Sequence, residues 1–141
     1  MSSLAALLDQ ELGALRAVLA TLQVERTALQ DRSAEALLAA SNAKSEAVAR
    51  AVRLEQERRA LVEANPGTMP AAASQSLTEL KCLAAECRQQ NDANGLLIRG
   101  QRRRIEGSLN VLRGGRAAAG TYGRDGETRP VRGPRQALAS Y

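Results

Sequence analysis

Leucines at alternating spacings of four and three dominate the N-terminal part of the chain. This alternation places its members on one face of an α-helix and is typical of a helix that packs along another helix. With Ser3 as N-cap, it predicts a helix over residues 4–30, about 40 Å long at 1.5 Å per residue. The series consists of Leu8, Leu12, Leu15, Leu19, Leu22 and Leu29, with Arg26 as its one interruption.

Composition narrows the fold class. The 141 residues are 44% apolar, yet they include no Phe, no Trp and only two Tyr. Leu, Ala, Val and Ile suffice for helices that pack side by side, whereas compact β-sheet cores usually rely on aromatic side chains. The expected fold is all-α: an elongated antiparallel three-helix bundle or coiled-coil hairpin, with a long third helix and a flexible C-terminal tail.

Capping and breaking residues set the other helix boundaries. At Asp31-Arg32-Ser33 the chain either turns or bends slightly and continues, and a turn is favoured. The next helix, over residues 34–64, is expected to pack on the first helix as an antiparallel hairpin. The segment 65–70 contains two prolines and a glycine and ends that helix. Ser76-Leu77-Thr78-Glu79 matches a capping box and predicts a third helix over residues 77–112.

The second helix has a looser apolar face than the first, and Lys44 and Arg58 interrupt it. Charges of alternating sign along residues 55–59 predict a solvated face. The helices together form a predicted bundle domain, residues 1–113, followed by a basic tail, residues 114–141.

The third helix has an apolar face with polar residues in its middle. An unpartnered buried amide costs about 1–3 kcal/mol, so the amides either fix register and pairing or face a partner that is not always present. On this reasoning, replacing Asn91 and Asn94 by leucine is expected to stabilise the isolated protein. The face consists of Leu77, Leu80, Ala84, Cys87, Asn91, Asn94, Ile98, Gln101, Ile105 and Leu112, with Leu109 one place off register.

The third helix is also the longest, at about 54 Å, and is expected to project beyond the hairpin. The projecting part combines the basic run 102–104 with an apolar stripe made of Ile105, Leu109 and Leu112. Exposed stripes of this kind mark interaction sites.

Several classes of protein are disfavoured. The chain has no His, the commonest general base and metal ligand, so no enzyme, cofactor or metal site is expected. Cys82 and Cys87 lie too far apart along a helix for a disulfide and are expected to be free thiols, with Cys87 in the core. No stretch of eighteen apolar residues and no basic N-terminal signal is present, so a cytoplasmic protein without membrane insertion is expected.

The tail concentrates the positive charge. Residues 113–141 contain 6 basic and 2 acidic side chains, within a net charge of +5 for the chain. They also contain both tyrosines, Tyr122 and Tyr141. Tyrosine is a frequent binding anchor, and Tyr122 lies between glycines in a segment with too few apolar residues to fold alone.

Two short motifs resemble those of a known family. They are Cys87-x3-Asn91-x2-Asn94-Gly95-x-Leu97-Ile98 on the third helix and Thr121-Tyr122-Gly123-x2-Gly126 in the tail. With Lys44 and Glu55-x2-Arg58 as weaker support, the chain resembles the FlgN family of flagellar type III export chaperones. The resemblance implies a cytoplasmic all-α chaperone that binds hook-associated proteins at the hook–filament junction and delivers them to the export apparatus.

The same resemblance implies further partners, namely the cytoplasmic part of the export gate and the export ATPase complex. A cargo helix laid against the apolar stripe would be kept from associating before export. The residues expected to bind partners are Asn91, Asn94, Gly95, Ile98, Ile105, Leu109, Leu112 and Tyr122.

Two other functions fit parts of the sequence. A structural coiled-coil protein without a dedicated cargo would self-associate through the same apolar faces, and self-association is also conceivable for a cargo-free chaperone. Nucleic-acid binding through the arginines at 102–104 and in the tail is disfavoured, because no aromatic residues are interleaved with them and no binding motif is present.

Overall fold

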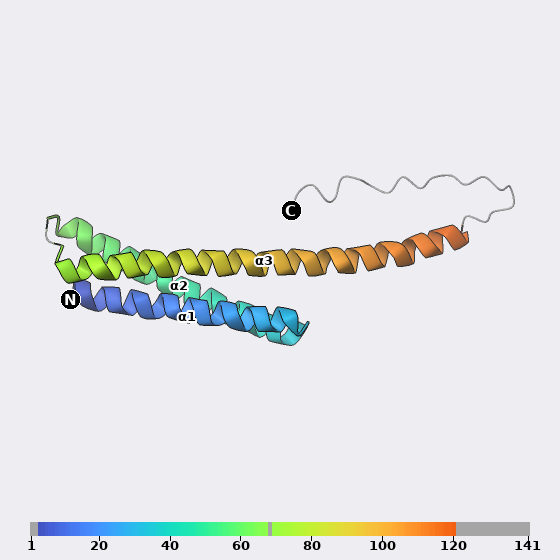
Figure 1. The fold of residues 1–141 in the computed structure, drawn as a ribbon, viewed down its shortest axis with the longest axis horizontal. Helices are drawn as coiled ribbons and strands as arrows, with labels where there is room; N and C mark the ends of the chain where they lie inside the picture. Colours follow the sequence, from blue (N-terminus) through green and yellow to red (C-terminus); the bar gives the residue numbers. More distant parts are fainter. Residues whose placement is uncertain (1–2, 68, 121–141) are drawn as a thin grey trace. The chain divides into compact units, whose positions relative to one another are not determined.

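The computed structural model describes residues 3–67 and 69–120, which form three α-helices: α1 (Leu4–Gln30), α2 (Ala34–Ala64) and α3 (Ala71–Gly120) (Figure 1). The predicted all-α three-helix bundle is confirmed, as are the bounds of the first two helices. Among these residues, no helix is both long and apolar enough to cross a membrane. The chain divides into two compact units, residues 1–99 and 100–141.

Serine caps begin the first two helices, as the sequence predicts. The Ser3 hydroxyl accepts a hydrogen bond from the Ala6 amide, and the Ser33 hydroxyl accepts one from the Ala36 amide, each at 3.2 Å. Between α1 and α2, Arg32 adopts a φ of 53°, which lets the chain reverse within three residues. In the loop after α2, Gly67 has a φ of 100°, a conformation that favours glycine.

The third helix begins six residues earlier than its predicted start at Leu77. Its first turn forms directly after Pro70, whose carbonyl accepts hydrogen bonds from the amides of Ala73 and Ser74 at 3.0 and 3.2 Å. The capping-box prediction was therefore wrong. Three alanines of high helix propensity follow the proline, and the third of them, Ala73, is buried.

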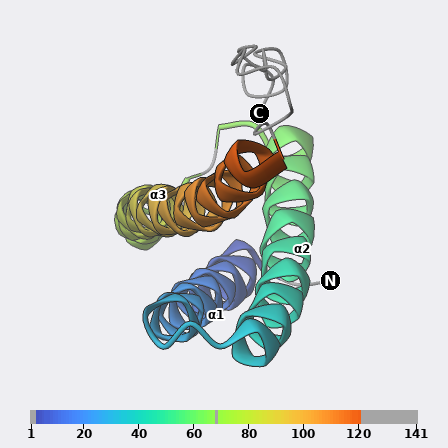
Figure 2. The ribbon, with the colours of Figure 1, turned by 90° about the vertical axis from the view of Figure 1, so that its right-hand side faces the viewer.

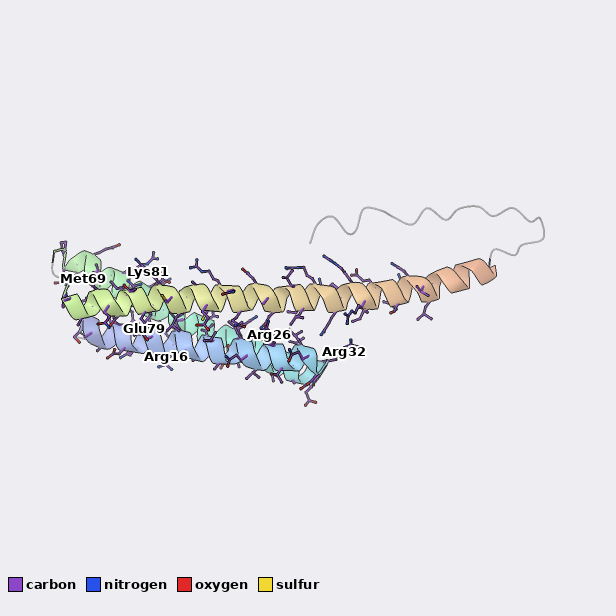
Figure 3. The ribbon with its side chains drawn as sticks, viewed as in Figure 1. Arg16, Arg26, Arg32, Met69, Glu79 and Lys81 are labelled. Carbon is purple, nitrogen blue, oxygen red and sulfur yellow. The ribbon has the colours of Figure 1, made fainter. Side chains whose placement is uncertain are left out.

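The acidic residue of the predicted capping box has another role. Glu79 lies 2.6 Å from Arg16 of α1, and Figure 3 shows both side chains where α1 and α3 meet. This pair is exposed, so it contributes little to stability.

The third helix also ends later than predicted. It continues to Gly120, eight residues past Leu112, and the predicted domain boundary at residue 113 falls inside it. The run Arg116-Ala117-Ala118-Ala119 has high helix propensity, which offsets the cost of Gly114 and Gly115. The rest of the predicted tail, residues 121–141, lies outside the described residues.

Helix α1 is the central element of the first unit. It buries ten residues, against three in α2, because two of its faces are covered rather than one. Seen end-on in Figure 2, the helices of this unit lie at the corners of a triangle. One cluster joins α1 to α2 and to Cys87, and the other joins α1 to α3. The first contains Leu7, Ala14, Val18, Leu22, Ala51, Leu54 and Cys87, and the second contains Leu8, Leu12, Ala73 and Leu80.

Two ion pairs, each with a buried glutamate, connect α1 to α2. The Arg58 guanidinium donates to both Glu11 carboxylate oxygens, at 2.6 and 3.3 Å, and the Lys44 ammonium lies 2.7 Å from the Glu25 carboxylate. The two glutamates are 14 residues apart along α1, and their partners are 14 apart along α2 in the opposite direction. Both pairs therefore belong to the same antiparallel register, about 21 Å apart along the helices.

The solvated face predicted for residues 55–59 needs correction. The Arg58 side chain is only 17% exposed because it reaches α1, whereas its neighbour Arg59 pairs with Glu55 at the surface. Residues of opposite charge therefore pair at interior positions of the α1–α2 hairpin. A purely apolar interface would leave the register of the two helices unspecified.

Asn94 extends the second ion pair to α3. Its amide nitrogen donates to the Leu22 carbonyl at 2.9 Å and to the Glu25 carboxylate at 3.0 Å, and the residue is fully buried. Glu25 thus accepts from α3 while it pairs with α2. Of the two explanations for the polar seam, fixing register and pairing fits Asn94.

We expect Arg58→Met to lower the free energy of unfolding by about 3–5 kcal/mol, because it leaves the Glu11 carboxylate buried without a counter-charge. Adding Glu11→Leu should recover most of the loss. Urea unfolding followed by circular dichroism measures both variants. The matched control is Arg59→Met, one position along, where an exposed pair is lost and a change below about 1 kcal/mol is expected. Equal losses at the two positions would contradict the role of the buried pair.

The sequence predicts that leucine at positions 91 and 94 stabilises the isolated protein, but the structure predicts a loss of stability for Asn94→Leu. Asn94→Leu removes two hydrogen bonds and leaves Glu25 short of a donor, so we expect a loss of about 1–3 kcal/mol. Asn91→Leu, at an exposed position, should change stability by less than about 0.5 kcal/mol. Thermal unfolding of the two single variants tests this difference, and a rise in Tm for Asn94→Leu would show that its bonds contribute nothing net.

Candidate functional site

The motif Cys87-x3-Asn91-x2-Asn94-Gly95-x-Leu97-Ile98 lies on α3 in the first unit. Some of its residues lie in the core and others at the surface. Cys87 is buried, and its thiol lies 3.6 Å from the Leu15 carbonyl, to which it donates. Burial, with a smaller contribution from Glu86, raises the pKa of the Cys87 thiol, so it stays protonated at neutral pH. Cys82 is exposed, and both cysteines are free, as predicted. Cys87 is thus a core residue.

The two asparagines of the motif have different surroundings. Asn94 lies in the core and offers no surface to a partner in this arrangement. Asn91, predicted to face another helix, is exposed, and its side-chain oxygen accepts from Lys44 at 3.3 Å. The buried positions of α3 recur every seven residues, which places Asn91 at the edge of the interface; they are Ala73, Leu80, Cys87 and Asn94.

The C-terminal end of the motif is partly open. Gly95 and Ile98 are half-buried. A Cβ built on Gly95 would meet only the flexible Arg99 guanidinium, at 3.6 Å, so no packing contact requires glycine here. Leu96 and Leu97 are 65% and 37% exposed. This part of α3 therefore combines core residues with apolar side chains open to solvent, and its contact with a partner stays a prediction.

The apolar stripe lies in the second unit. Ile105, Leu109 and Leu112 are 61%, 44% and 66% exposed, at spacings of four and three along α3. On a helix these spacings place the three side chains on one face. Exposure of the stripe, expected from the sequence, is confirmed. Val111 is 75% exposed as well, but lies about a third of a turn away from Leu112.

Four arginines lie on the same stretch of α3 as the stripe. Arg102, Arg103, Arg104 and Arg113 are all exposed, and none of them pairs with a carboxylate among residues 3–67 and 69–120. Their charge is available to an acidic partner. Gln101, the third polar seam residue, is half-buried, and Tyr122 lies outside the described residues.

The acidic side chains nearest the core have structural roles. In the described part of the chain, no three His, Cys, Asp or Glu side chains come together as metal ligands would. The carboxylates nearest the core, Glu11 and Glu25, are held by cations and are structural. Sequence reasoning missed both of them. The sequence does contain a signal for these two residues. Two acidic residues lie 14 apart on the first helix, and two basic residues lie 14 apart on the helix after the turn.

The chain was compared with known proteins. A protein-family model described as FlgN protein matches residues 1–130. No curated protein and no solved structure matches the chain. The match covers all three helices, both ion pairs and the stripe. The chain therefore belongs to the FlgN family, and its general role is that of a chaperone in flagellar type III export.

Proposed function

We propose that this protein binds hook-associated proteins in the cytoplasm and delivers them to the flagellar export apparatus. The single observation that supports cargo binding is the stripe of Ile105, Leu109 and Leu112, whose apolar side chains remain exposed on one helix face. Family membership supports the choice of cargo.

The stripe suits one helix of a partner. Its spacing of four and three is the pattern by which two helices pack, and an amphipathic cargo helix would cover it along about two turns. Burying three large aliphatic side chains that are now about half exposed supplies moderate affinity, which fits a cargo that must be released.

Self-association through the same stripe is the alternative. The unpaired arginines at 102–104 and 113 oppose it, because a second copy would bring the same charges close together. A cargo helix with acidic flanks would instead pair with them.

We expect Ile105→Asp and Leu109→Asp each to weaken binding of a purified hook-associated protein at least tenfold while leaving helical content unchanged. A charged side chain on the stripe must be desolvated when the cargo helix covers it. Isothermal titration and circular dichroism measure the two effects. Val111→Asp is the matched control, since Val111 is the more exposed but lies off the stripe. Loss of helical content in the stripe variants, or wild-type binding by them, would contradict the proposal.

The tail is proposed to contact the export gate through Tyr122. Tyrosine can bury a large surface at a low entropic cost and keeps a hydroxyl for hydrogen bonding. We expect Tyr122→Ala and truncation after Arg113 to weaken binding to the cytoplasmic part of the gate at least fivefold. Tyr141→Ala provides the matched control. Gate binding by both altered chains at the wild-type level would assign the tail another role.

A further inference from the structure

A groove runs between α2 and α3 within the first unit. It consists of two adjoining hollows of about 560 and 680 Å³ that share Val18, Val48, Cys87 and Arg88. The floor comes from α1, and the walls come from α2 and from residues 77–91 of α3. We refer to this surface as the α2–α3 groove.

The groove is an open helix–helix interface. The α1 helix packs on both of its neighbours through buried clusters, whereas the facing sides of α2 and α3 keep apolar side chains in solvent. Val48 and Val52, four residues apart on α2, are 41% and 44% exposed. On the opposite wall, Leu77 and Ala84 are only half-buried. A fourth helix would cover these positions and complete a four-helix arrangement.

The charges along the groove indicate which kind of helix would fit it. Three of its cations are neutralised within the bundle, since Lys44, Arg58 and Arg59 pair with Glu25, Glu11 and Glu55. Lys81 and Arg88 also line the groove but have no ion-pair partner in the described part of the chain.

The two unpaired cations have a defined spacing. They lie seven residues apart on α3, about 10.5 Å and two turns along the same face. In Figure 3, Lys81 lies on the edge of α3 opposite to Glu79, which faces α1. The α3 wall from Leu77 to Asn91 spans about 21 Å, equivalent to four helical turns.

Segments of this chain are poor occupants. Residues 100–114 carry four arginines and one glutamate, and residues 121–141 carry four arginines, one aspartate and one glutamate. Both are basic and would bring like charge to Lys81 and Arg88. The tail also contains Pro130 and Pro134, which interrupt a helix.

We propose that the α2–α3 groove is a second docking surface, which takes an acidic amphipathic helix of the exported cargo. The occupant has about four turns, an apolar stripe that contacts Val48 and Val52, and two carboxylates seven residues apart that pair with Lys81 and Arg88. This inference rests on the proposed function, because it takes a hook-associated protein as the source of the helix.

Charge reversal tests the pairing. The full chain with Lys81→Glu and Arg88→Glu should bind a purified hook-associated protein at least tenfold more weakly than the wild type, and the loss should shrink at high salt. The matched control is Arg50→Glu with Arg53→Glu, which changes net charge equally at exposed positions of α2 that do not line the groove. Its binding should stay within twofold of the wild type.

Cross-linking tests the location. A photoreactive amino acid at Val52 should cross-link to the hook-associated protein, and the cross-linked cargo peptide should contain acidic residues seven positions apart. The control position is Leu38, which is 64% exposed on α2 but outside the groove, and it should give no cross-link.

The outcomes separate the two proposals. Absence of any binding by the wild-type chain would overturn the proposed function and this inference with it. Wild-type affinity in the Lys81 and Arg88 variant, with binding lost in the stripe variants, would overturn the groove alone. Equal losses in both charge-reversal variants would also overturn it, since the effect would then follow net charge rather than position.

Discussion

The register between α1 and α2 is the constraint on which the rest of the bundle depends. Leucine seams alone tolerate a shift by one heptad, because every seventh position is apolar in either alignment. Glu11 with Arg58 and Glu25 with Lys44 remove that freedom, since a shift would leave the two buried glutamates without their counter-charges. Asn94 then ties α3 to the second pair. One carboxylate, Glu25, thus contacts all three helices.

A bundle built around one two-sided helix leaves an interface incomplete. Because α1 covers one face of α2 and one face of α3, those two helices need not bury their remaining apolar residues against each other. Val48 and Val52 are the residues left open as a result. In an ordinary monomer such exposure has a cost in solubility, and the helix proposed to dock in the α2–α3 groove would cover these side chains.

The series of residues spaced by three and four continues along α3 almost without a break, whereas the burial of its members changes along the helix. Asn94 is fully buried, Ile98 is half-buried and Ile105 is 61% exposed, although all three belong to the same series of threes and fours. The series indicates a face that can pack on a helix, and it does not indicate whether the partner is in the same chain. Under the proposed function, the chain uses a single sequence pattern both for its own core and for its cargo.

The sequence by itself determined the helices, the bounds of α1 and α2, the free cysteines and the exposure of the stripe, because helix periodicity, caps and breakers act within a few residues. It misplaced both ends of α3, since a capping box and a glycine pair are weak signals beside tertiary contacts and alanine propensity. Only the tertiary structure decided that Glu11, Glu25 and Asn94 are core residues and that α2 and α3 leave a groove. The physical reason is that a buried charge is acceptable only opposite its counter-charge, and positions 47 residues apart along the chain meet only once the hairpin has formed.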